Sequence, residues 1–121
     1  MKLNFDCIVI GGGPSGLTAA MYLKRSNKNV LVIEKGIPGG QINYASVIEN
    51  YPGFETIEGP SLANAMYTQA MKMGVTFKSA EVLSVNLENE EKVVKTFDEE
   101  YNSDNVIIDI GRKRKKLGIP N

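Results

Sequence analysis

Apolar positions along the chain change from unbroken runs to helical spacing and back again. Residues 5–10 (FDCIVI) and 29–34 (NVLVIE) are short apolar runs, which are typical of strands that a parallel sheet buries on both faces. Between them, apolar residues recur at helical spacing from Pro14 to Lys24, and a proline suits the first turn of a helix. The order of strand, glycine turn, helix and strand predicts a βαβ unit with parallel strands.

The rest of the chain continues this pattern with a second helix and several strands. Residues 59–74 predict a helix that a proline opens and a glycine closes, and we expect its methionine-rich face to lie in the core. Residues 75–88 and 92–99 alternate or carry β-branched side chains, which predicts strands joined by a hairpin. Residues 104–111 (DNVIIDIG) predict another buried strand that ends in glycine.

These elements together predict an α/β fold, in which helices flank a Rossmann-type parallel sheet and residues 81–97 form a small antiparallel β layer. The length of 121 residues favours one domain. The 14 Lys and Arg residues balance 14 Asp and Glu residues, so net charge gives no reason to expect nucleic acid or a membrane as a partner. No apolar run could span a bilayer and the first residues do not resemble a signal peptide, so we expect a cytoplasmic protein.

The chain contains one cysteine, Cys7, and no histidine. One cysteine excludes an internal disulfide, a C-x-x-C redox pair and a cysteine-based zinc site within this chain. The lack of histidine removes the commonest general base and metal ligand. We therefore expect no catalytic residue and no metal site, and we expect Cys7 to be an inert residue of a buried strand. A cofactor or a further segment must supply any chemistry.

The glycine turn after the first strand fits the pattern G-x-G-x-x-G with Gly11, Gly13 and Gly16. In this pattern the first glycine allows a sharp turn, the second lets the backbone approach a pyrophosphate, and the third lets the helix pack closely on the strand. The helix N-terminus then offers free N–H groups and a partial positive charge to the phosphates. The alternative interpretation is a glycine turn that binds no ligand.

An acidic residue, Glu34, ends the second predicted strand. At this position a carboxylate can accept hydrogen bonds from a ribose. A negative charge there also disfavours a 2′-phosphate, so FAD or NAD is preferred to NADP. The segment that follows, residues 35–54, is a long loop rich in Gly, Pro and Asn, and loops of this length are usually functional or disordered. Its scattered apolar residues argue against disorder.

Four stretches of the sequence resemble thioredoxin reductase of the small type, in order and in spacing. They are DCIVIGGGPSGLTAAMYLKR (6–25), GGQI (39–42), ENYPGF (49–54) and VIIDIGRKRKKLGIP (106–120). The resemblance covers essentially the whole chain. The pair GGQ and ENYPG is far more specific than the glycine pattern, because related flavoproteins usually keep the glycines without this pair.

The resemblance implies a role in FAD binding for several residues. It implies that the turn holds the FAD pyrophosphate, that the end of the second strand meets the adenosine ribose, and that the loop reaches the flavin. The residues implied at the pyrophosphate are Gly11, Gly13, Pro14, Ser15 and Gly16, and those implied at the ribose are Glu34 and Lys35. On the flavin side, the resemblance implies that Gly40 and Gln41 line the path to the flavin and that Asn50 reaches the isoalloxazine. It also implies that the backbone of Val82 meets the adenine and that Gly111 lies near the dinucleotide. For Gln41 and Asn50, loop capping is the alternative role.

Members of the family that this sequence resembles are longer than this chain. The resemblance implies that residues 1–121 are the N-terminal part of an FAD-binding domain, without the NADPH domain, its C-x-x-C pair and a returning C-terminal FAD segment. The complete enzyme would pass electrons from NADPH to FAD, to the cysteine pair and to thioredoxin. We expect the chain alone not to reduce a disulfide, and we expect its unfinished sheet to favour a homo-oligomer. The alternative is a non-enzymatic Rossmann module that binds a nucleotide weakly or serves as a protein partner.

The sequence departs from the family at Asp109-Ile110-Gly111, where the family has Ala-Thr-Gly. Asp109 brings a carboxylate close to the expected position of the anionic cofactor or of the glycine turn. We expect this charge to weaken FAD binding. The basic cluster that follows, residues 112–116 (RKRKK), is expected to be a solvated connection, with a phosphate or protein contact as the alternative.

Overall fold

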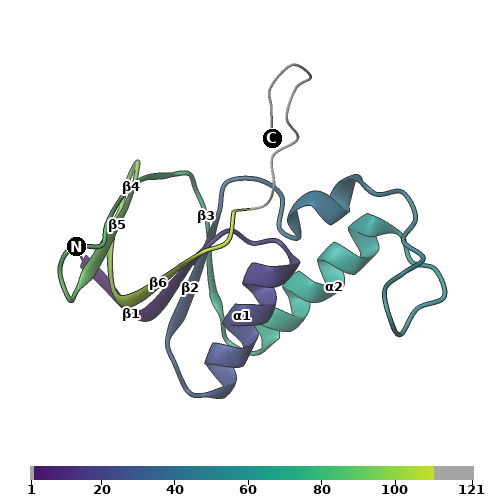
Figure 1. Ribbon diagram of the computed structural model, residues 1–121, viewed down its shortest axis with the longest axis horizontal. Coiled ribbons are helices and arrows are strands. Elements are labelled where there is room, and N and C mark those ends of the chain that lie inside the picture. Colours follow the sequence, from purple (N-terminus) through teal and green to yellow (C-terminus); the bar gives the residue numbers. More distant parts are fainter. Residues whose placement is uncertain (1, 111–121) are drawn as a thin grey trace.

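The chain folds into six strands, two α-helices and one short 3₁₀-helix in a computed structural model that describes residues 2–110 (Figure 1). The elements are β1 (Lys2–Ile10), α1 (Pro14–Arg25), β2 (Val30–Glu34), the 3₁₀-helix η1 (Gly40–Tyr44), α2 (Gly59–Lys72), β3 (Thr76–Ser79), β4 (Val82–Asn86), β5 (Lys92–Thr96) and β6 (Glu100–Ile108). Both helices lie where the spacing of apolar residues predicts them.

One mixed sheet contains all six of these strands, in the order β3-β2-β1-β6-β5-β4. β1 pairs in parallel with β2 and with β6, and β2 pairs in parallel with β3. The register places Ile10 opposite Ile33 on one side and opposite Ile108 on the other. The carboxyl ends of the central strands therefore lie side by side, and the glycine turn follows directly from one of them. The α/β, Rossmann-type prediction is confirmed.

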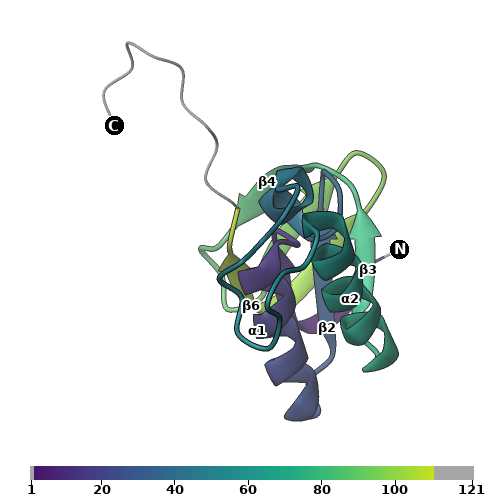
Figure 2. The same cartoon turned by 90° about the vertical axis from the view of Figure 1, so that its right-hand side faces the viewer.

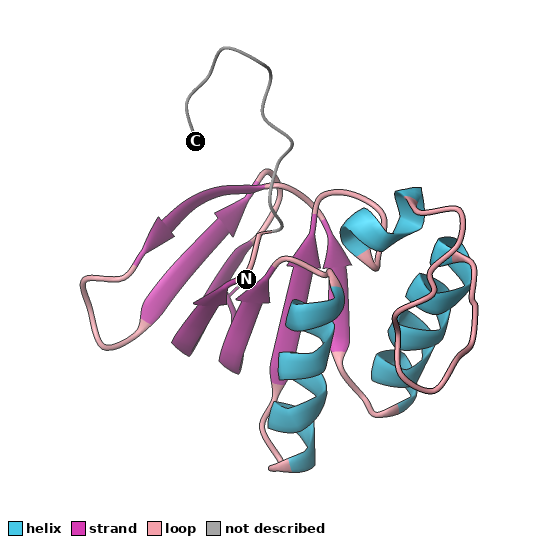
Figure 3. Cartoon of the chain, turned by 45° about the vertical axis from the view of Figure 1, so that its right-hand side comes forward, coloured by secondary structure: helices cyan, strands magenta, loops and turns pink. Residues whose placement is uncertain are grey.

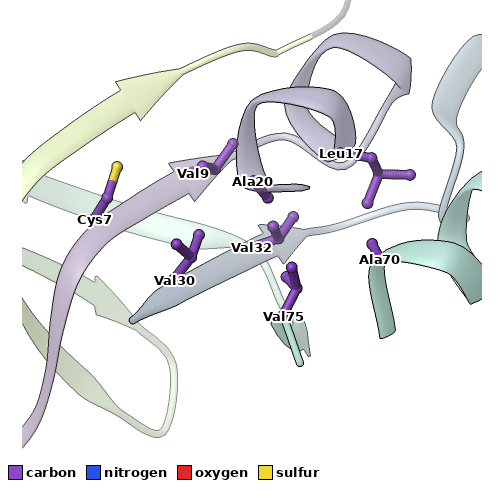
Figure 4. Packing of buried hydrophobic residues seen from close by; sticks show 8 residues of the cluster. All are labelled: Cys7, Val9, Leu17, Ala20, Val30, Val32, Ala70 and Val75. Atoms are coloured by element: carbon purple, nitrogen blue, oxygen red, sulfur yellow. The ribbon is translucent and has the colours of Figure 1, made fainter. Parts of the chain in front are cut away.

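Helices α1 and α2 cover one face of the sheet (Figure 3) and lie side by side in front of it in Figure 2. Figure 4 shows the core between these helices and the sheet. Its buried residues are Cys7, Val9, Leu17, Ala20, Val30, Val32, Ala70 and Val75. Met66 and Met71 of α2 pack partly buried against this cluster, as expected for the methionine-rich face.

Cys7 is a buried member of this core, as its place in β1 predicts, and 3% of it is exposed. Burial raises the pKa of its thiol, and the negative charge of Asp6 raises it further. The thiol therefore stays protonated at neutral pH and has little nucleophilic character.

The antiparallel strands β4 and β5 continue the sheet through the first residues of β6. From there they curl over the face that the helices leave free, so that Val82, Val85 and Val94 pack with Ile8 and Ile10. The expected antiparallel layer is thus present, and it belongs to the same sheet rather than to a separate one (Figure 1).

Strand β6 begins earlier than the apolar pattern predicts. The sequence indicated a strand from Asp104, whereas the strand starts at Glu100. The added residues pair with β5, where Lys95 lies opposite Glu100 and Lys92 lies opposite Ser103. This pairing buries Tyr101, Asn102 and Ser103 although two of the three are polar. Long-range pairing, which single-sequence patterns do not contain, sets this boundary.

Candidate functional site

The glycine turn between β1 and α1 leaves no room for side chains at two of its positions. Gly11 has a φ of 117°, and a Cβ built on it would collide with the carbonyl oxygen of Asp109. A Cβ on Gly16 would collide with the carbonyl oxygen of Gly11. The chain therefore turns sharply out of β1, and α1 packs closely on that turn, as the glycine spacing predicts.

The second glycine of the pattern, Gly13, has an open side instead. It is the N-cap of α1 with a φ of −77°, and the nearest atom to a Cβ built on it is the carbonyl oxygen of Gly39 at 4.0 Å. No side chain caps the helix, and the Leu17 N–H reaches back to the Gly13 carbonyl at 2.9 Å. The earlier N–H groups of the first turn, which include that of Ser15, thus have no acceptor within the helix. This arrangement suits an anion.

Glu34 connects the end of β2 to the glycine turn. Its Oε1 accepts a hydrogen bond from the Gly12 N–H at 2.6 Å, and its Oε2 accepts one from the Gly36 N–H at 2.7 Å. These two bonds fix the carboxylate at the edge of the turn, and each oxygen keeps a further lone pair for a hydroxyl donor. Sequence reasoning missed Gly12. A Cβ on Gly12 would lie 2.9 Å from the Glu34 Cβ. The available signal was the middle glycine of the GGG run at residues 11–13, which the pattern G-x-G-x-x-G does not require.

A pocket of about 330 Å³ lies beside the turn, between the carboxyl ends of β1, β2 and β6 and the facing strand β4. It brings together four of the predicted site residues: Gly11, Glu34, Lys35 and Val82. The rest of the lining, which sequence reasoning missed, is mostly apolar and consists of Ile10, Ile33, Ala80, Glu81, Val85, Ile108 and Ile110. The pocket therefore combines an apolar floor with charged groups at one edge, which suits a flat ring attached to a polar group.

The start of the long loop folds back against the glycine turn. The Gly39 N–H donates to the Gly12 carbonyl at 2.8 Å, and a Cβ on Gly40 would lie 3.2 Å from the Gly13 Cα. Gly39 itself has a φ of 98° and lies so close to Ala63 of α2 that a side chain there would collide with it. The structure thus places Gly40 next to Gly13, and exposed Gln41 follows at the start of η1.

The structure does not bring Asn50 to the pocket. Asn50 is exposed in the loop between η1 and α2, which runs along the outer side of α2 (Figure 1). An isolated bridge between Ile48 and Ile57 closes this loop. The predicted contact between Asn50 and the flavin stays a prediction. Gly111 and residues 112–116 lie outside the described residues.

Apolar side chains are exposed near the end of β6. The exposed fractions are 36% for Ile107, 54% for Ile108 and 68% for Ile110. Neighbouring residues of a strand point to opposite faces, so Ile107 and Ile108 do not share one, and Ile108 and Ile110 line the pocket beside the turn. The expected self-association stays a prediction. Between residues 2 and 110, no helix is long and apolar enough to cross a membrane.

Four features define a Rossmann-type dinucleotide-binding unit. They are a strand, a sharp turn in which Gly11 and Gly16 leave no room for a side chain, a helix N-terminus, and a carboxylate at the end of the next strand. Comparison with known proteins agrees with this class. The family model of pyridine nucleotide-disulphide oxidoreductases matches residues 5–121. The chain belongs to the pyridine nucleotide-disulphide oxidoreductase family.

Individual relatives narrow the resemblance to thioredoxin reductases. The chain is 47% identical to thioredoxin reductase of Bacillus subtilis over 96% of its own length. It is 39% identical to thioredoxin reductase of Listeria monocytogenes over 94% of its length. The crystal structure of Lactococcus lactis thioredoxin reductase in the FR conformation matches 96% of the chain with a TM-score of 0.90 and 41% identity.

The match covers only part of each relative. The chain spans 37% of the B. subtilis protein, 36% of the L. monocytogenes protein and 38% of the L. lactis chain. What it shares with them is the FAD-binding region, with the same arrangement of sheet and helices.

Proposed function

We propose that this chain is the FAD-binding portion of a thioredoxin reductase-like flavoprotein. The observation that carries the proposal is the bond from Gly12 to Glu34, which places a carboxylate between the glycine turn and the pocket of about 330 Å³. The residues present fit the AMP half of FAD. The apolar floor suits the adenine, the Glu34 edge suits the ribose, and the open side of Gly13 suits the pyrophosphate.

The phosphates would meet backbone groups rather than side chains. Gly13 leaves free space where a methyl group would otherwise stand, and the uncapped first turn of α1, with Pro14 and Ser15, faces the same region. Partial positive charge at a helix N-terminus stabilises phosphate oxygens. Gly11 and Gly16 act through geometry, because they allow the turn and the close packing of α1.

Glu34 and Lys35 would position the adenosine at the edge of the pocket. The remaining lone pairs of Glu34 would accept hydrogen bonds from the ribose hydroxyls, and the backbone of Val82 would meet the adenine from β4. From the pyrophosphate, the flavin would extend toward Gly40 and Gln41, since Gly40 lies beside Gly13. A contact with Asn50 would require the loop between η1 and α2 to approach the flavin.

Bound FAD would supply electron transfer to a disulfide, and we propose NADPH as the donor and a thioredoxin-like protein as the acceptor in the complete protein. The resemblance to thioredoxin reductases supports both partners. The fold alone does not show whether NADPH or another molecule donates electrons to the FAD. A ferredoxin-flavin thioredoxin reductase from Clostridium acetobutylicum matches 96% of the chain with a TM-score of 0.85 and 27% identity.

Titration of the chain with FAD, followed by flavin fluorescence, tests the proposal. Glu34→Ala should weaken binding about tenfold, because hydrogen bonds from ribose to a charged acceptor are lost. Glu88→Ala is the control, since Glu88 is exposed on the β4–β5 hairpin and does not line the pocket. Lack of saturable FAD binding, or equal affinities for the wild-type chain and Glu34→Ala, would contradict the proposal.

A further inference from the structure

The end of β6 brings two exposed isoleucines to the pocket beside the glycine turn. Ile108 and Ile110 both line this pocket, and their exposed fractions are 54% and 68%. The Asp109 N–H donates to the Ile10 carbonyl at 2.8 Å, so the parallel pairing continues past the last residue of β6. Because side chains alternate along an extended strand, Ile108 and Ile110 share a face, whereas Ile107 does not line the pocket.

These isoleucines belong to the part of the apolar lining that a ligand can newly cover. The isoleucines of the floor are already buried by the protein, since only 8% of Ile10 and 1% of Ile33 are exposed. Free energy is gained when apolar surface leaves water, so a floor that is already dry contributes little to binding. The apolar gain on binding therefore comes from the lining that is still exposed, and Ile110 is its most exposed apolar member.

Polar side chains are few in the same lining. They belong to Glu34, Lys35 and Glu81. The Glu34 carboxylate is held at the edge of the turn by the N–H groups of Gly12 and Gly36, at 2.6 Å and 2.7 Å. Every other lining residue is a glycine or carries an apolar side chain. A flat base in this pocket would therefore be selected mainly by the apolar area that it covers.

We propose that Ile110, together with Ile108, makes the pocket prefer nucleotides that carry a large aromatic base. This inference rests on the proposed function, because it takes the pocket as the place of the base. A purine ring packed against these two side chains would remove their exposed apolar surface from water, and a smaller pyrimidine ring would cover less of it. The thioredoxin reductases that the sequence resembles have threonine at the position of Ile110, so this contact would be particular to this chain.

Two substitutions of Ile110 with the same shape test the proposal. Valine and threonine differ only by a methyl group in place of a hydroxyl, and both keep the branched Cβ that suits an extended strand. In calorimetric titrations of the full chain with ADP, Ile110→Val should weaken binding by no more than about twofold, whereas Ile110→Thr should weaken it about fivefold. Because Ile110 is 68% exposed, neither change should lower the melting temperature measurably.

The base preference supplies a readout that a merely structural role of Ile110 would not change. UDP has the same ribose and pyrophosphate as ADP but a smaller base. The wild-type chain should bind ADP more tightly than UDP, and Ile110→Thr should reduce this ratio of affinities about threefold. A structural effect on the turn would instead weaken both nucleotides by the same factor, and an unchanged ratio would overturn the proposal.

Ile107→Thr is the matched control, because it makes the same chemical change on the side of β6 that does not line the pocket. This variant should keep the ADP affinity of the wild-type chain. Equal weakening by Ile110→Val and Ile110→Thr, or by Ile107→Thr and Ile110→Thr, would overturn the inference about the base. If Glu34→Ala weakens ADP binding in the same experiments, those outcomes leave the proposed function intact. Lack of saturable binding of both ADP and FAD would contradict the proposed function, and the inference with it.

Discussion

The parallel and antiparallel halves of this sheet differ in how tightly they constrain their residues. In β2, all residues from Val30 to Ile33 are at most 1% exposed, because the helices cover one face and the curled hairpin covers the other. In β4, Val82 and Val85 pack inward while Leu83 is 61% exposed. The centre of the parallel half therefore encloses β2 on both faces, whereas the antiparallel half serves mainly as a cover for one face.

The same contrast holds for the backbone. In the parallel half, the turn at Gly11 and Gly16 brings main-chain atoms so close that a methyl group has no space. The hairpin between β4 and β5 contains no glycine. At the glycine turn, substitutions can therefore separate the effect of close main-chain packing from the effect on binding.

Gly16→Ala should have the largest effect on stability. The added methyl group collides with the carbonyl oxygen of Gly11 and lies 3.3 Å from Val9 Cγ1, so α1 must move away from β1. Overpacking against backbone atoms should lower the free energy of unfolding by about 3 kcal/mol. Urea denaturation followed by circular dichroism measures this change.

Gly13→Ala is the matched control for that experiment. A methyl group on Gly13 meets nothing nearer than 4.0 Å, and its φ of −77° suits alanine. Its free energy of unfolding should therefore stay close to that of the wild-type chain, while FAD affinity falls because the methyl group occupies the space proposed for the pyrophosphate. Equal destabilisation by both alanines would show that the turn does not constrain the two positions differently.

A pair of leucine substitutions compares the two halves directly. Leu17 of α1 is fully buried, so Leu17→Ala should cost about 3 kcal/mol through lost burial and a cavity. Leu83 of β4 is 61% exposed, so Leu83→Ala should change stability by no more than about 0.5 kcal/mol. The same denaturation measurement decides the matter, and a comparable loss in both variants would contradict the proposed difference between the halves.

The parallel half was also the part that the sequence predicted best. The runs in β1 and β2 and the helical spacing in α1 are local signals, and the glycines of the turn have a direct geometric reason. The bond between Gly12 and Glu34 joins residues 22 positions apart, so no local pattern contains it. The burial of Asn102 and Ser103 likewise depends on pairing with β5. The expectation for Asn50 rested on family resemblance, and the structure places its loop away from the pocket.

Asp109→Ala tests the boundary between the turn and β6, with a smaller expected effect. The Asp109 N–H donates to the Ile10 carbonyl at 2.8 Å, and its carbonyl oxygen lies against Gly11, so the residue adjoins the turn as expected. Removing the carboxylate should tighten FAD binding several-fold, because screened repulsion between like charges about 6 Å apart is on the order of 1 kcal/mol. Fluorescence titration measures the affinity, with Glu88→Ala as the control. Unchanged or weaker binding would show that the carboxylate faces away from the cofactor.

The smallest expected effect concerns the ion pair that links the two halves. Lys78 of β3 lies 3.4 Å from Asp98 in the turn between β5 and β6, and Asp98 also accepts a hydrogen bond from the Thr96 hydroxyl at 3.2 Å. The Thr96 bond and then Lys78 lower the pKa of Asp98, and the hydrogen bond to Asp98 raises the pKa of Lys78. Asp98→Asn should therefore lower the melting temperature slightly at neutral pH, because exposed ion pairs contribute little.

The pH dependence distinguishes this link from a general effect of the substitution. A carboxylate with a lowered pKa stabilises the folded chain above its ordinary pKa, and this contribution disappears as the pH falls through the lowered value. For Lys78 the sign is opposite, because its contribution is lost as the pH rises through its raised pKa. The melting temperatures of the wild-type chain and Asp98→Asn should therefore differ at neutral pH and converge in acid. Glu100→Gln is the control, since its partner Lys95 lies 3.9 Å away on the neighbouring antiparallel strand and does not link the halves. A difference for Asp98→Asn that persists in acid would show that the substitution acts through local turn geometry rather than through the charge that joins β3 to the antiparallel half.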